Sequence, residues 1–220
     1  MFKIISNTIV RDGMPFIGKV LEQVTPLMDK MVITLSEKSS DGTKDEILKI
    51  STKYPNKIIL LYENVETRSL LTGERNRQLQ NSDSEWVMIL DDDDYWEIDQ
   101  LEKCLAELPK DKEILACAVN PIQLLDKETF NSWRDGKRWF SKFLRKTPDL
   151  HFINPWPRDM PINGEILHWK YSQKIKYLPY HFYHLSDLKT GSFRKIEDWS
   201  KKFDRDNVRP KKLANPVNFL

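Results

Sequence analysis

Residues 85–96 read EWVMILDDDDYW, an apolar run of strand character that ends in four consecutive aspartates. Acidic clusters are most often solvated loops, and a strand has to end in something polar, so the four carboxylates do not define a site by themselves. No lysine or arginine stands beside them in the sequence, and a divalent cation would relieve their mutual repulsion. The stretch therefore predicts a strand followed by either a solvated loop or a cation site.

Upstream of this stretch, strand-like and helix-like segments alternate. Strand character is found in residues 2–10, 31–35 and 57–62, and helical spacing or composition is found in residues 14–28, 43–54 and 72–82. This alternation is typical of a mostly parallel sheet flanked by helices. Ligands bind outside the carboxyl ends of the strands in such sheets, and both SEKSSDGT (36–43) and DDDDYW (91–96) follow predicted strands.

Length and composition indicate an ordinary globular chain. Its 220 residues suffice for one sizeable core, and we expect one α/β domain over residues 1–220. Cys104 and Cys117 lie in apolar segments, which predicts buried thiols in a reducing compartment. No segment has the length of a signal peptide's apolar core or of a membrane span, so the expected location is cytoplasmic.

The formal charge of +2 is unevenly distributed along the chain. Residues 1–100 carry 12 basic against 18 acidic side chains, net −6, and the remainder carries 23 against 15, net +8. A basic C-terminal part suits an anionic partner, although dispersed lysines also serve solubility.

Two blocks of the chain together resemble glycosyl transferase family 2, which has the GT-A fold. VITLSEKSSDGT (32–43) is similar to the family's strand and acidic turn, and GERNRQLQNSDSEWVMILDDDDYW (73–96) is similar to its helix with an Arg-Asn pair before a strand ending in Asp-x-Asp. The resemblance covers roughly residues 2–103. It implies a GT-A-type, Rossmann-like, mostly parallel sheet flanked by helices, with a nucleotide-sugar-binding part in 1–103 and an irregular acceptor-binding part with a basic tail in 104–220.

The resemblance also implies residues that bind the nucleotide. Ser36 and Glu37 fall where the family contacts the base or ribose, although the family commonly has aspartate and glycine where this chain has Glu37 and Lys38. Arg75 and Asn76 match the pair near the nucleotide, and a structural ion pair is the alternative for Arg75. Asp41 and Gly42 match the turn itself, where a helix cap and a left-handed residue are the structural interpretation.

The same resemblance implies a site for Mn²⁺ or Mg²⁺. Asp91 resembles a ribose or metal contact, Asp92 stands at the variable position, and Asp93 resembles the ligand that holds the metal and diphosphate. Because all four residues are aspartates, the Asp-x-Asp motif can be aligned one position away, and Asp93 is the first choice for the metal ligand. In HFYHLSDLK (181–189), His184 is implied as a metal ligand in preference to His181, with Lys189 as a diphosphate contact.

The implied activity is an inverting hexosyl or pentosyl transfer from a nucleotide-sugar, expected to be a UDP-sugar, to a hydroxyl group of a saccharide. Such a reaction needs a carboxylate base, and Asp159 and Glu165 are the nearest candidates because the family's Glu-Asp pair is not evident. The basic C-terminal part keeps a hydroxylated base in nucleic acid as an alternative acceptor. The missing pair favours a second alternative, a nucleotide-binding or metal-binding module without turnover. A phosphatase with an aspartate nucleophile is a third.

Residues 131–146, NSWRDGKRWFSKFLRK, interleave aromatic and basic side chains. Trp133, Trp139 and Phe143 have near-helical spacing, which predicts an amphipathic helix covering the sheet. The alternative is an acceptor surface whose basic residues hold phosphates, namely Lys137, Arg138, Lys142, Arg145 and Lys146. Tyr95 and Trp96 are expected to be packing residues.

Overall fold

The structure is a computed structural model that describes residues 2–63, 68–126, 128–131, 139–153, 161–162, 165–166, 172–188, 210–213 and 217. The helices are α1 (Ile17–Val24), α2 (Thr43–Lys53), α3 (Arg68–Gln80) and α4 (Ile98–Ala106), with short 3-10 helices η1 (Thr25–Leu27), η3 (Ser172–Lys174) and η4 (Ser186–Leu188). The strands of the main sheet are β1 (Ile4–Val10), β2 (Lys30–Ser36), β3 (Ile58–Glu63), β4 (Trp86–Ile89), β5 (Asp94–Tyr95), β6 (Ala116–Leu124), β7 (Thr129–Asn131), β8 (Phe140–Arg145), β11 (Ile175–His184) and β12 (Pro210–Lys212). A separate two-stranded sheet pairs β9 (Pro161–Ile162) with β10 (Glu165–Ile166).

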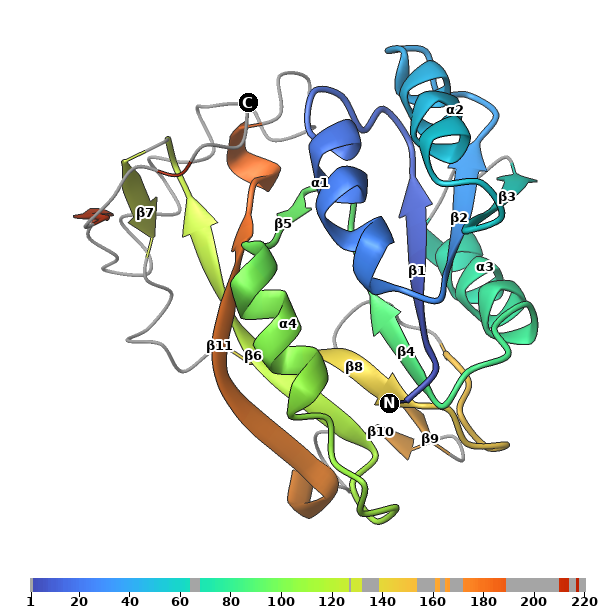
Figure 1. The fold of residues 1–220 in the computed structure, drawn as a ribbon, viewed down its shortest axis with the longest axis vertical. Helices are drawn as coiled ribbons and strands as arrows, with labels where there is room; N and C mark the ends of the chain where they lie inside the picture. The colour runs from blue at the N-terminus through green and yellow to red at the C-terminus, as the bar shows by residue number, and fades with distance from the viewer. Residues whose placement is uncertain are drawn as a thin grey trace.

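The main sheet has the strand order β12-β7-β6-β8-β4-β1-β2-β3, with β11 attached to β6 and β5 attached to β11. Strands β3, β2, β1 and β4 are parallel neighbours, as the alternation of elements predicts. Strand β8 runs antiparallel to both β4 and β6, and β11 runs parallel to β6. The carboxyl ends of β1, β4, β6 and β11 therefore lie at one edge of the sheet, where β5 joins β11 (Figure 1).

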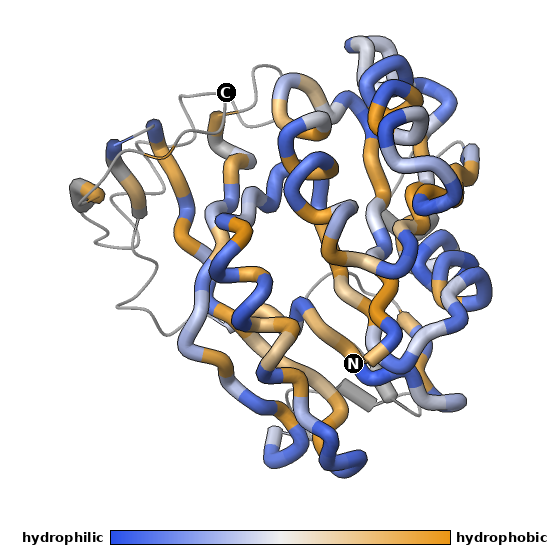
Figure 2. Tube along the Cα trace, viewed as in Figure 1, coloured by the Kyte–Doolittle hydropathy of each residue, from blue (hydrophilic) through white to orange (hydrophobic). Residues whose placement is uncertain are grey.

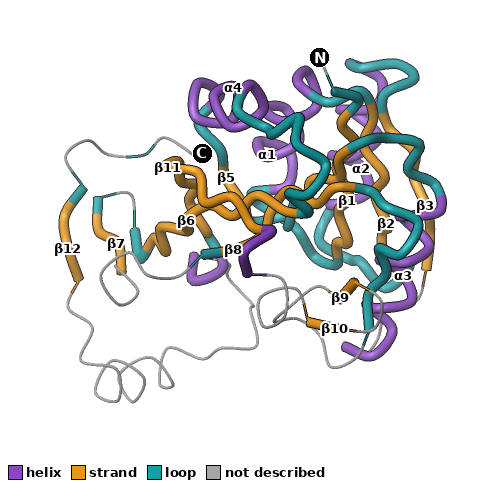
Figure 3. Tube along the Cα trace, turned by 90° about the horizontal axis from the view of Figure 1, so that it is seen from below, coloured by secondary structure: helices purple, strands orange, loops and turns teal. Residues whose placement is uncertain are grey.

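Helices pack on both faces of this sheet. One apolar cluster joins Val20 of α1, Ile47 of α2 and Leu101 of α4 to strand side chains. A second cluster joins Leu79 of α3 to the opposite face, and Figure 3 shows α3 on the other side of the strands from α1 and α4. Strands covered on both faces tend to read as apolar runs, as β2 and β4 do in Figure 2, whereas the middle of β1 buries Ser6, Asn7 and Thr8.

The amphipathic helix expected over residues 131–146 is wrong where that segment is described. Residues 140–145 form β8, in the centre of the sheet between β4 and β6. Phe143 joins the cluster under α1 and Leu144 joins the cluster under α3. Successive side chains of a strand point to opposite faces, so Phe143 and Leu144 fill the cores on the two sides of the sheet. Trp133 lies outside the described residues.

Several smaller expectations are confirmed. Cys104 and Cys117 are buried free thiols, and Tyr95 and Trp96 are buried packing residues. Trp96 stacks on Phe182 with ring centroids 5.2 Å apart. Within the part of the chain that the structure describes, the helices are too short and too polar to cross a bilayer.

Candidate cation and nucleotide site

Two loops at the carboxyl edge of the sheet are joined to each other. They follow β1 and β2 and comprise residues 11–14 and 37–42. Four hydrogen bonds connect the β1 loop to the β2 loop and the first residue of α2: Asp12 N to Ser39 Oγ (3.0 Å), Gly13 N to Thr43 Oγ1 (2.7 Å), Met14 N to Asp41 Oδ2 (2.8 Å) and Ser40 N to Asp12 Oδ1 (2.9 Å). Gly42 has φ +89°, a left-handed conformation that glycine adopts without strain. Gly42 therefore has the left-handed conformation that the sequence indicates. The expected cap by Asp41 is wrong, because the N-cap of α2 is Gly42 and no side chain caps the helix; Asp41 Oδ1 instead accepts a hydrogen bond from the amide of Thr43 at 3.1 Å.

The acidic run folds back on itself directly after β4. The amide of Asp94 donates to the carbonyl of Asp91 at 3.1 Å, and the amide of Asp91 donates to Asp94 Oδ2 at 3.0 Å. Asp94 then begins β5, which pairs antiparallel with the end of β11 so that Asp94 lies opposite His184. This short pairing brings together two residues that are 90 positions apart in the chain.

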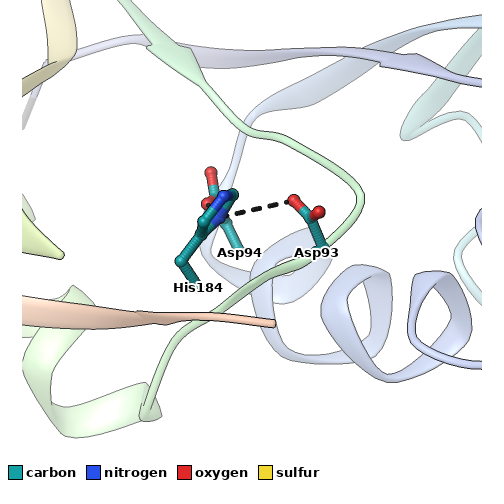
Figure 4. Close-up of side chains that lie close together, drawn as sticks. All are labelled: Asp93, Asp94 and His184. Atoms are coloured by element: carbon teal, nitrogen blue, oxygen red, sulfur yellow. Dashed lines mark hydrogen bonds and ion pairs between the residues drawn. The ribbon is translucent and has the colours of Figure 1, made fainter. Parts of the chain in front are cut away.

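Asp93, Asp94 and His184 form a cluster suited to a cation. One ligand atom from each lies within 4.8 Å of the others. The Nδ1 atom of His184 is 3.1 Å from Asp94 Oδ1 and 3.5 Å from Asp93 Oδ1, and Figure 4 shows the imidazole between the two carboxylates. Carboxylate oxygens are the ligands that Mg²⁺ and Mn²⁺ favour, and imidazole is a common metal ligand, so the residues fit such an ion.

The charges in this cluster change the proton affinity of the histidine. Burial by itself would lower the pKa of His184, but the carboxylates of Asp93 and Asp94 outweigh burial and raise that pKa to about 9. A bound divalent cation would have to displace this proton, because only the neutral imidazole is a metal ligand.

Two buried cations lie beneath the acidic run. Lys142 of β8 is 3% exposed, with Nζ 3.0 Å from Asp91 Oδ2 and in contact with Asp94 Oδ2. Arg75 of α3 is 2% exposed, with Nη2 3.0 Å from Asp91 Oδ1. Burial would raise the pKa of Asp91, but Lys142 and Arg75 outweigh it and hold this pKa well below its ordinary value. No lysine or arginine is next to the aspartates in the sequence, but the fold brings Lys142 and Arg75 into contact with Asp91.

Other residues expected to contact the nucleotide lie at or near the same edge. Ser36 is buried at the end of β2, and Glu37 is exposed just beyond it. Asp92 lies against Gly13, since a Cβ added to that glycine would be 3.0 Å from Asp92 Oδ2. Their roles toward a nucleotide stay predictions.

The Arg-Asn pair on α3 has extensive internal contacts. Arg75 Nη1 donates to the carbonyl of Asn7 at 2.7 Å, in addition to the ion pair with Asp91, which fits the structural alternative for this arginine. The side-chain amide of Asn76 exchanges two hydrogen bonds with the backbone of Phe152, at 3.0 and 2.7 Å. Any contact of these two side chains with a nucleotide stays a prediction.

Some predicted residues cannot be placed. Asp159 and Lys189 lie outside the described residues, as do Lys137 and Arg138, and only the backbone of Glu165 is described, in β10. His181 is turned to Tyr183, with ring centroids 5.3 Å apart, whereas His184 faces the aspartates.

Sequence reasoning did not assign Asp94 and Lys142 to this cluster. The sequence offers Lys142 only as a phosphate contact, because its pattern predicts a surface segment over residues 131–146 and not a buried strand. The available signal was a lysine between the apolar residues of a segment that also reads as a strand, since an interior lysine needs a carboxylate partner.

The fold has counterparts among solved structures. The structure of S. aureus TarS is similar with a TM-score of 0.51 at 17% identity, over 84% of this chain and 38% of the TarS chain. Mannosyltransferase PcManGT from Pyrobaculum calidifontis, in complex with GDP-Man and Mn²⁺, has a TM-score of 0.45 at 20% identity, over 56% of this chain and 36% of that one. The inositol-1-phosphate CTP transferase from T. maritima has a TM-score of 0.48 at 12% identity, over 90% and 94%.

At these identities the likeness concerns the fold alone. This chain spans well under two thirds of the TarS and PcManGT chains. No curated protein matches it. A sequence model described as glycosyl transferase family 2 matches residues 15–160, which is most of the chain and includes the β2 loop and the acidic run. The chain belongs to glycosyl transferase family 2.

Proposed function

We propose that this protein is a metal-dependent glycosyltransferase that moves one sugar from a UDP-sugar to a hydroxyl group of a saccharide. Membership of glycosyl transferase family 2 supports the class of reaction. The observation that carries the proposal is the cluster of Asp93, Asp94 and His184 at the carboxyl edge of the sheet. Ligands of open α/β sheets bind at this edge.

In this proposal, Asp93 and His184 are the protein ligands of Mn²⁺ or Mg²⁺. Asp94 Oδ1 lies 3.1 Å from Nδ1 of His184 and orients the imidazole. When bound, the ion supplies positive charge that stabilises the departing diphosphate. The carboxylates of the acidic run thereby act on the leaving group and not on the acceptor.

The remaining roles follow the family resemblance. Ser36, Glu37, Asp91 and Asp92 are proposed to contact the nucleoside, Asn76 to lie near the nucleotide, and Arg75 or Lys189 to steady the diphosphate. Asp159 or Glu165 is proposed to remove the proton from the acceptor hydroxyl as its oxygen attacks the anomeric carbon opposite the departing diphosphate, and this single displacement would invert the anomeric centre. Residues 1–103 then form the donor part, and residues 104–220 form the acceptor part of one domain.

Calorimetric titration with UDP, with and without Mn²⁺, tests the donor site. We expect Mn²⁺-dependent binding by the wild type and at least about 10-fold weaker binding by Asp93→Ala, since a metal ligand is lost. Asp99→Ala is the matched control, because Asp99 lies on nearby α4 with its side chain 61% exposed and paired to Lys103. Equal binding by Asp93→Ala and Asp99→Ala contradicts the assignment of Asp93.

Release of free sugar from a panel of nucleotide-sugars, without acceptor, tests turnover. Cleavage of a UDP-sugar supports a transferase with intact chemistry. Binding of UDP without cleavage of any donor, even with saccharide acceptors present, identifies a binding module instead. Transfer to DNA carrying hydroxylated bases, with affinity that falls steeply with salt, identifies nucleic acid as the acceptor.

A further inference from the structure

Lys142 is a charged side chain in the middle of the sheet. It is 3% exposed on β8, and its ammonium lies 4.8 Å from the ring centroid of Phe182. A lysine in such surroundings stays charged only where carboxylates compensate the loss of water. Burial lowers the pKa of Lys142, but Asp91 and Asp94 outweigh burial and raise it. The lysine is therefore a permanent positive charge at neutral pH.

Two of the four aspartates, Asp91 and Asp94, form ion pairs with Lys142. Asp91 is paired with both Lys142 and Arg75, and Asp94 is bonded to Lys142 and His184 and to the backbone amide of Asp91. The four carboxylates of residues 91–94 carry four negative charges, and Lys142 and Arg75 carry two positive ones. With His184 neutral, as a metal ligand must be, two negative charges remain, and one divalent cation neutralises them.

Lys142 also marks a point where a metal would fit. Asp91 Oδ2 and Asp94 Oδ2 both lie within 3.0 Å of its Nζ atom. The larger of the two shifts that would bring these oxygens to the 2.0–2.2 Å bonds of a small divalent cation is only about 1 Å, for Asp91. An ammonium group in that place excludes the metal from these two carboxylates.

We propose that Lys142 is a positioning residue, a built-in counterion that occupies Asp91 and Asp94 and so directs the added cation to Asp93 and His184. The inference rests on the proposed function, because it concerns the same cation site. It also makes a separate claim, that an added cation can take the place of the lysine charge when Lys142 is removed. In the wild type, the side chain of Asp91 is 38% exposed beside its two ion pairs, and this exposed part can still face the nucleoside.

Thermal unfolding of the full chain at neutral pH, with and without millimolar Mn²⁺, tests this claim. Lys142→Met keeps the length of the side chain and removes its charge, and Lys142→Arg retains the charge. Lys176→Met is the matched control, since Lys176 is a 39% exposed lysine on β11 paired with Glu107. We expect Lys142→Met to have a lower Tm than the wild type without metal, and Mn²⁺ to raise its Tm at least twice as much as that of the wild type.

Calorimetry with Mn²⁺ alone gives the affinity. Removal of one positive charge beside the site should tighten Mn²⁺ binding by about 10-fold in Lys142→Met and leave Lys142→Arg and Lys176→Met unchanged. A Lys142→Met protein with the wild-type Tm shift and affinity, or smaller ones, overturns the proposal. A wild type without any Mn²⁺ response, beside a Lys142→Met protein that gains one, overturns the metal dependence of the proposed function and supports the counterion.

Asp91→Asn tests the division of the aspartates if Lys142→Met does not fold. Since Lys142 and Arg75 already occupy Asp91, the Mn²⁺ affinity of Asp91→Asn should stay within about 5-fold of the wild type, a small effect for a screened neighbouring charge. Asp93→Asn should lose Mn²⁺ binding. An equal loss in both variants overturns the proposal.

Discussion

Substitution of Arg145 tests whether this basic residue of β8 stabilises the fold or binds phosphate. The sequence offers it as a candidate for binding phosphate, but the structure buries it in an internal contact. It is 8% exposed, and its guanidinium donates to three carbonyls of the segment that leads from α4 to β6: Pro109 at 2.6 Å, Asp111 at 2.8 Å and Ile114 at 2.8 Å. The same group lies 4.5 Å from the ring centroid of Trp86. We expect Arg145→Met to destabilise the protein without changing its affinity for anions.

The expected size follows from these contacts. Three hydrogen bonds at about 1 kcal/mol each and a cation–π contact of about 0.5–1 kcal/mol give a loss of about 3–4 kcal/mol. The carbonyls lie near the surface and can be hydrated in the variant, which is why the lower hydrogen-bond value applies. For a chain of this size, that loss lowers Tm by about 10 °C. Arg145→Lys keeps the charge but loses the planar group, so about half of the loss should remain.

Urea unfolding measures the loss, and Arg77→Met is the control. The side chain of Arg77 is 36% exposed, pairs with Glu74 and Glu63, and donates one hydrogen bond to the carbonyl of Tyr62, so its removal should cost about 1–2 kcal/mol, less than that of Arg145. A polyanion titration is run on the same variants. If Arg145→Met unfolds at the wild-type urea concentration and binds polyanions more weakly, the structural role given to Arg145 is refuted.

Two further predictions concern stability and reactivity. Gly13→Ala should cost about 1–3 kcal/mol, since its Cβ would lie 2.7 Å from Val10 Cγ2 and 3.0 Å from Asp92 Oδ2. Gly73→Ala on α3, where a Cβ meets nothing within 4 Å, should instead add about 0.5–1 kcal/mol, and equal urea midpoints for both variants would contradict this contrast. Burial raises the pKa of the Cys117 thiol to about 12 and that of Cys104 above its ordinary value. Both thiols should therefore resist a disulfide reagent at mildly alkaline pH in the native state and react in denaturant. Because unfolded thiols ionise first, stability should fall as pH rises past their ordinary pKa. Rapid labelling of the native protein would show that these segments open.

The first half of the fold could be predicted because its signals are local. The strands from β1 to β4 are rich in apolar or β-branched residues and end in turns, α1 and α2 have helical periodicity, and α3 has the composition of a helix. Strand β8 could not be predicted because the partners of its buried basic side chains are distant in the sequence. Lys142 meets Asp91 from 51 positions away, and Arg145 meets Asp111 from 34 positions away. Without those partners, aromatic and basic residues at this spacing favour a surface helix.

The candidate site divides in the same way. The position of the acidic run after β4 follows from the sequence. The distribution of its carboxylates does not, because four neighbouring aspartates are chemically equal until Arg75, Lys142 and His184 approach from three different elements. The pairing of β5 with β11 decides that His184 is the histidine facing the aspartates, and no local pattern encodes that pairing.

The four hydrogen bonds between the β1 loop and the β2 loop bear on protein engineering. Three backbone amides in residues 12–14 donate to side chains of Ser39, Asp41 and Thr43. A graft that replaces residues 37–43 alone, to alter the choice of nucleotide, would remove these acceptors and release a segment that abuts Asp92 through Gly13. The smallest exchangeable cassette is therefore discontinuous, and residues 11–14 and 37–43 must be transplanted together.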